Sequence, residues 1–132
     1  MSFISVNEQC VSHIEKYARK LREIFPHIEH ETDEQIEDGI YGLALTQSLT
    51  NIYEACMKVN SEELEDKLLP IIRKTKVARN IASHNYDAIN WSIVKNNCRI
   101  VIKLAVPEFF EECYGICERH KRLTPDYTGD IE

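Results

Sequence analysis

The chain has 132 residues and a formal net charge of −6, a length typical of one domain around one hydrophobic core. Its overall acidity argues against a protein that coats nucleic acid without specificity, and no apolar run approaches the ~20 residues that span a bilayer. The first residues, MSFISVNEQC, lack the basic and then apolar layout of a secretion signal. We therefore expect a cytoplasmic protein without membrane contact.

Helical periodicity dominates the first half of the chain. Apolar residues recur every three or four positions from about 6 to 25, which predicts an amphipathic helix ending at or near Pro26. Thr32 then opens the capping-box pattern T-D-E-Q, and a second helix is expected from there to about residue 59. The residues expected to mark one face of this second helix are Ile36, Ile40, Leu43, Gln47 and Thr50 or Asn51.

Three further helices are expected in the second half. Ser61 has the position of an N-cap for a third helix that runs to about Ile81, with a kink or break at Pro70. Asp87 or Asn90 is expected to cap a fourth helix, and Pro107 to begin a fifth that ends near Arg122. The apolar residues expected on related faces of the fourth helix are Trp91, Val94, Cys98, Val101 and Ala105.

The sum is an all-α bundle of four or five helices in up-down order. We expect one domain over residues 1–122, followed by a disordered tail over 123–132, where apolar periodicity is missing.

The five cysteines are odd in number and do not have the spacing of a disulfide framework, so buried reduced thiols are expected. Cys113, Cys117 and His120 can share a helix face, but no C-x-x-C pair completes a zinc site. No glutamate is followed three residues later by histidine, as a di-iron bundle requires. Neither a metal nor another cofactor is expected.

The segment RKTKVAR, residues 73–79, contains four cations and no acid. The acids lie mostly elsewhere, in 29–38, 62–66 and 108–118. A local basic ridge on an acidic protein indicates either a site that binds a phosphate backbone at one place or a helix face exposed to solvent. The cations of the ridge are Arg73, Lys74, Lys76 and Arg79.

The adjoining segment RNIASHNY, residues 79–86, combines groups suited to phosphoryl chemistry. Arg79 binds phosphate oxygens, Asn80 offers a hydrogen-bonding amide, and His84 titrates near neutral pH. On an unbroken helix, Arg79 and His84 are about 140° apart around the axis. For the two to cooperate, either the helix breaks near the turn-forming Ser83 or a second chain completes the site.

The wider stretch RNIASHNYDAINWSIV resembles the signature of the HEPN superfamily (higher eukaryotes and prokaryotes nucleotide-binding). It is most similar to the HepT-like toxin branch, whose pattern is R-N-x-x-x-H-x-Y followed by an acidic turn and an apolar helix. Arg79, Asn80, His84 and Tyr86 match this pattern in order. The specific match covers about a quarter of the chain.

This resemblance implies a homodimer that pairs through the motif helices, with Arg79 and His84 of both chains facing one cleft. It implies a metal-independent endoribonuclease of a type VII-like toxin-antitoxin system, with RNA contact at the basic ridge. The partner would be a minimal nucleotidyltransferase (MNT) antitoxin, which can attach AMP to the motif tyrosine, here Tyr86, or neutralise the toxin by binding. The alternative is a catalytically silent HEPN scaffold that binds a nucleotidyltransferase or a nucleotide.

Overall fold

The computed structural model describes residues 5–84 and 89–123, with residues 81–84 described by their backbone alone. This part of the chain forms six α-helices and no strand. They are α1 (Val6–Ile28), α2 (Asp33–Asp38), α3 (Tyr41–Cys56), α4 (Glu62–His84), α5 (Trp91–Leu104) and α6 (Pro107–Leu123). The predicted all-α class is confirmed.

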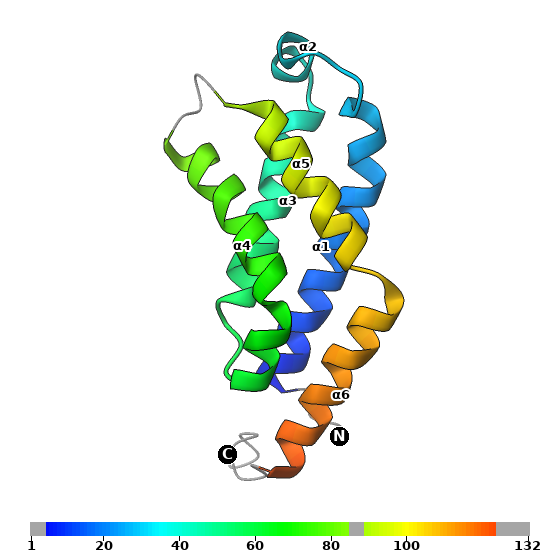
Figure 1. Cartoon of the computed structure of the whole chain (residues 1–132), viewed down its shortest axis with the longest axis vertical. Helices are drawn as coiled ribbons and strands as arrows, with labels where there is room; N and C mark the ends of the chain where they lie inside the picture. Colours follow the sequence, from blue (N-terminus) through cyan, green and yellow to red (C-terminus); the bar gives the residue numbers. More distant parts are fainter. Residues whose placement is uncertain (1–4, 85–88, 124–132) are drawn as a thin grey trace.

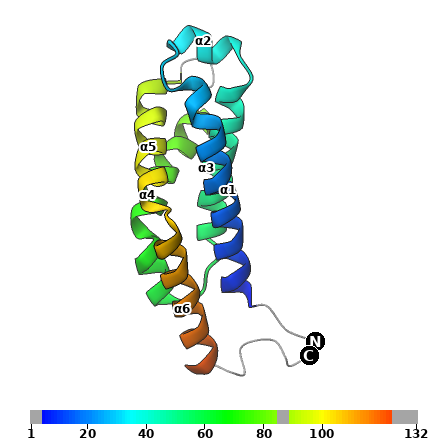
Figure 2. The ribbon, with the colours of Figure 1, turned by 90° about the vertical axis from the view of Figure 1, so that its right-hand side faces the viewer.

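Helices α1, α3, α4 and α5 form a four-helix bundle in which they run alternately up and down (Figure 1). Short α2 covers one end of this bundle, and α6 continues beyond α5 at the other end (Figure 2). Helices α1 and α4 both pack against α3 and α5, so they occupy opposite corners of the bundle. The tail, residues 124–132, lies outside the described residues.

Helix α1 begins where the sequence predicts and ends later. Ser5 and Glu8 form a capping box, in which the backbone N–H of Glu8 donates to Ser5 Oγ at 3.2 Å. The predicted end near residue 25 is wrong, because the helix continues through Pro26 to Ile28. Pro26 itself is exposed, while Ile28 is fully buried. Burying this last turn outweighs the one backbone hydrogen bond that proline removes.

The predicted second helix is two helices. The capping box of Thr32 and Gln35 is present, but α2 ends at Asp38 and α3 begins at Tyr41. This break changes the helical register, so the predicted face is partly wrong: Ile40 and Leu43 are 77% and 76% exposed. The apolar residues that α3 buries are Leu45, Leu49, Ile52, Ala55 and Cys56.

Gly42 fixes how α3 packs after the break. A Cβ at this position would lie 2.7 Å from Ile36 Cγ2 and 2.8 Å from Trp91 Cη2. Both neighbours are buried core side chains. The chain therefore folds back with the backbone of α3 directly against α2 and the start of α5, a closeness that glycine permits.

Helix α4 is longer and more continuous than predicted. Its N-cap is Ser61 as expected, with the backbone N–H of Leu64 donating to Ser61 Oγ at 3.2 Å. The helix continues through Pro70 and past Ile81 to His84. Pro70 is exposed, and the buried residues on either side of it, Leu68 and Ile71, keep the helix against the core.

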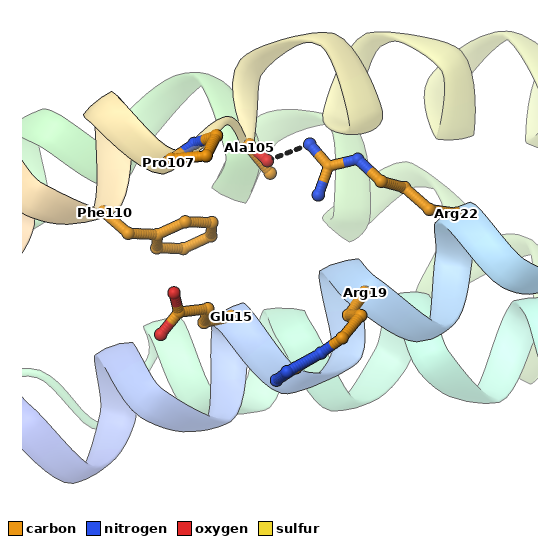
Figure 3. A pocket seen from close by; sticks show the side chains of 6 residues that line it. All are labelled: Glu15, Arg19, Arg22, Ala105, Pro107 and Phe110. Carbon is orange, nitrogen blue, oxygen red and sulfur yellow. Dashed lines mark hydrogen bonds between the residues drawn. The ribbon is translucent and has the colours of Figure 1, made fainter.

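Helices α5 and α6 agree with the predicted boundaries. Asn90 caps α5 by accepting from the backbone N–H of Ile93 at 3.2 Å, and the five apolar residues predicted on this helix are buried. Pro107 begins α6. At the junction of α5 and α6, Arg22 of α1 donates to the carbonyl oxygen of Ala105 (Figure 3). It also donates to the carbonyl oxygen of Ile102 at 3.2 Å. These carbonyls would otherwise be unpaired at the end of a helix.

Candidate functional site

The motif residues lie at the end of α4. Arg79 and Asn80 stand in its last turns, and the helical backbone continues to His84. The side chain of His84 lies outside the described residues, as does all of Tyr86. The possibility of a helix break between Arg79 and His84 is wrong, because both positions belong to one helix. The two positions are therefore about 140° apart around the axis.

Arg79 is half-buried beside α3. Its guanidinium carbon Cζ lies 5.5 Å from the centre of the Tyr53 ring, which is a cation–π distance. Tyr53 lies on a different helix, and no spacing pattern in the sequence links it to Arg79. Asn80, by contrast, is exposed to solvent.

The basic ridge is present as a helix surface. Arg73 and Lys76 are exposed and Lys74 is half-buried. Residues three apart on a helix are about 60° apart around the axis, so Arg73, Lys76 and Arg79 form one slanting row. Lys74 lies on the other side of Arg73. Arg73, Lys76 and Arg79 thus lie in a row along α4 that ends at the motif.

Among the side chains described, those of Arg73, Lys74 and Lys76 take part in no ion pair. Cations elsewhere are engaged: Lys67, near the start of α4, pairs with Glu112, and Arg119 of α6 pairs with Glu63 at 2.5 Å. The cations of the ridge therefore keep their donors available for an anion, since none of the carboxylates in the described residues pairs with them.

Two hollows lie away from Arg79. One of about 430 Å³ is at the end of the bundle where α2, α3 and the start of α5 meet. Trp91 contributes to its wall and donates from Nε1 to Glu37 Oε1 at 3.4 Å. The second, of about 180 Å³, lies between α1 and the junction of α5 and α6, with Glu15 and Phe110 at one side (Figure 3).

The cysteines are packing residues. All five are buried and free, as predicted. Burial raises the pKa of Cys56, Cys98 and Cys113 to about 12, so these thiols stay protonated at neutral pH. In the described part of the chain, no three histidine, cysteine, aspartate or glutamate residues form a group able to hold a metal ion.

The helical architecture and the motif at the end of α4 together define an all-α bundle of the HEPN type. A sequence model of the family described as "Ribonuclease HepT-like" matches residues 14–113. The chain therefore belongs to the HepT-like ribonuclease family, and the resemblance inferred from the sequence is confirmed. The match includes the whole of α4 and α5, and with them the motif.

No curated protein and no solved structure matches the chain. No helix within the described residues is both long and apolar enough to cross a membrane.

Proposed function

We propose that the protein is the toxin of a toxin-antitoxin pair and acts as a metal-independent endoribonuclease with a cleft shared by two copies of the chain. The observation that carries this proposal is the unbroken α4, on which the positions of Arg79 and His84 lie about 140° apart around the helix axis. A second copy of α4, related by a two-fold axis, supplies the second His84 imidazole, which one chain cannot bring to the same phosphate.

The two proton transfers of the reaction are carried out by two His84 imidazoles, one from each chain. One neutral His84 accepts the proton of a ribose 2′-hydroxyl, and the 2′-oxygen then attacks the adjacent phosphorus. The bond from phosphorus to the 5′-oxygen breaks, and the protonated His84 of the second copy donates a proton to that oxygen. The products are a 2′,3′-cyclic phosphate and a free 5′-hydroxyl. Arg79 stabilises the negative charge that builds up on the phosphate oxygens, and Asn80 hydrogen-bonds the RNA beside it.

RNA approaches along the ridge of Arg73, Lys74 and Lys76. These cations are unpaired within the described structure, whereas acids dominate α2 and the first turn of α4. Binding should therefore weaken with salt, with a slope of log affinity against log salt of roughly −0.7 for each phosphate contact. Replacing Lys76 by alanine should make this slope shallower by about one contact.

The proposed regulator is a nucleotidyltransferase antitoxin of the MNT type, which the resemblance of the motif to the HepT-like toxin branch implies. An AMP group on Tyr86 adds bulk and negative charge two residues from His84, which repels an RNA phosphate. Mass spectrometry after co-expression with such an enzyme should find the AMP mass on a peptide containing Tyr86. An unmodified Tyr86, with cleavage nonetheless suppressed, would assign inhibition to binding alone.

Cleavage by the purified protein tests the activity. Total RNA is incubated with the protein in EDTA, beside His84→Ala and Arg79→Ala. Arg19→Ala, which removes an exposed arginine on α1, is the matched control. The two motif variants should lose activity by at least about 100-fold, and the control should retain it. RNA left intact by the unmodified wild-type protein and by every variant would favour the silent scaffold instead.

Mixed dimers test the shared cleft. Wild-type and His84→Ala chains with different affinity tags are refolded together, and the dimer carrying both tags is isolated. Because the mechanism needs both imidazoles, this dimer should be as inactive as the His84→Ala homodimer. Half of the wild-type activity would assign a complete site to each chain, and a monomer in light scattering would remove the shared cleft altogether.

A further inference from the structure

Among the cation–ring contacts of the described structure, that of Arg79 with Tyr53 is the one that joins two helices without an ion pair on the cation. Lys16 and Tyr17, which also make such a contact, are neighbours on α1. Lys67 lies over Phe109 and Arg99 over Phe25, but each of these cations also pairs with a glutamate. Arg79 has no ion pair among the described residues. The ring of Tyr53 is therefore what restrains this guanidinium.

The helix directions explain why the two side chains meet. Helices α3 and α4 are antiparallel neighbours joined by a short connection (Figure 1). Side chains lean toward the N-terminus of their own helix. Arg79 thus reaches back along α4 while Tyr53 reaches back along α3, and the two approach each other in the groove between the helices. Tyr53 is itself half-buried, which restrains its ring.

We infer that Tyr53 is a positioning residue, which holds the guanidinium of Arg79 in place for the phosphate of the RNA. The inference rests on the proposed function of Arg79. A ring face attracts the cation without occupying its N–H groups, which point outward in the guanidinium plane. A carboxylate in the same place would take those donors and neutralise the charge. Tyr53 thus orders Arg79 and leaves it free to bind an anion.

The inference predicts a specific pattern among variants. Tyr53→Leu keeps apolar bulk but removes the ring, and should lower kcat and the affinity for RNA together by about three- to tenfold. Tyr53→Phe keeps the ring and should stay within about twofold of the wild type. Tyr17→Leu is the matched control, since Tyr17 is also half-buried and its ring lies 5.5 Å from Nζ of Lys16 on α1, a cation with no ion pair among the described residues. It should leave both quantities unchanged.

Two readouts separate this inference from the proposed activity. The first is cleavage of natural RNA, and the second is the affinity for a 2′-O-methyl oligonucleotide, which cannot be cut by 2′-oxygen attack. Each is measured for Tyr53→Leu in the wild-type and Arg79→Ala backgrounds, with thermal unfolding to confirm that each variant folds. If Tyr53 acts through Arg79, removing the ring has no further effect once the guanidinium is gone.

The outcomes are distinct. Weaker oligonucleotide binding that vanishes in the Arg79→Ala background, with no cleavage by the wild type, would support the positioning role and refute the ribonuclease proposal. Equal cleavage and affinity for Tyr53→Leu and wild type would overturn the positioning role and leave the activity standing. The role would also be overturned by a loss in Tyr53→Phe, by an undiminished loss in the Arg79→Ala background, or by a wild type that neither binds nor cuts.

Discussion

Gly42→Ala tests the packing that sets the start of α3. The new Cβ would stand 2.7 Å from Ile36 Cγ2 and 2.8 Å from Trp91 Cη2, and both neighbours are more than nine-tenths buried. Overpacking of such a site costs about 2–3 kcal/mol, while replacing glycine by alanine in a helix returns up to about 1 kcal/mol. The expected net loss is about 1–2 kcal/mol of unfolding free energy, or roughly 4–8 °C in Tm.

Gly115→Ala is the matched control for this change. Gly115 lies within α6, and a Cβ there meets only Arg119 Nη1, at 3.9 Å. This variant should gain about 0.5–1 kcal/mol from helix propensity and lower backbone entropy in the unfolded chain. Urea unfolding followed by circular dichroism measures both. A Gly42→Ala protein as stable as the wild type, beside a stabilised Gly115→Ala, would contradict the close contact of α3 with Ile36 and Trp91.

Three further predictions concern stability. Ser61→Ala removes the acceptor for the Leu64 N–H and should cost about 1 kcal/mol in urea unfolding; an unchanged midpoint would mean that this cap contributes nothing. Arg22→Met keeps the aliphatic stem but leaves the carbonyls at the end of α5 without their donor, and should cost about 1–2 kcal/mol, with Arg19→Met as a neutral control. Burial raises the pKa of the Cys56, Cys98 and Cys113 thiols from about 9 to about 12 in the folded protein. Above pH 9 the thiols of the unfolded chain therefore lose their protons first, and the stability that the buried thiols contribute below pH 9 is lost as pH rises. The free energy of unfolding should therefore be lower at pH 10.5 than at pH 8. The difference should be smaller in the Cys98→Ala variant.

Local chemistry made much of the fold predictable. The caps at Thr32, Ser61 and Asn90 depend on a side chain and a backbone N–H two or three residues away, so the sequence alone indicates where those helices begin. The buried face of α5 likewise follows from its period. The end of α1 was less predictable, because its last turn is held by the burial of Ile28 against distant segments.

The break between α2 and α3 was missed for the same reason. Gly39 and Gly42 look tolerable within a helix when only their neighbours in sequence are considered. In the structure α2 ends at Asp38, the backbone of Gly39 after it is extended, and Trp91, a residue far along the chain, packs close to the backbone of α3 at Gly42. Ile40 and Leu43 are exposed in this arrangement, although both side chains are apolar.

The sequence by itself determined the helical class, the family and the chemical identity of the motif, since these depend on residue types and short spacings. Only the tertiary structure decided that α4 continues unbroken from Arg79 to His84 and that Tyr53 lies against Arg79. The physical reason is that a helix propagates where its buried face finds partners, and those partners come from segments that no local pattern connects.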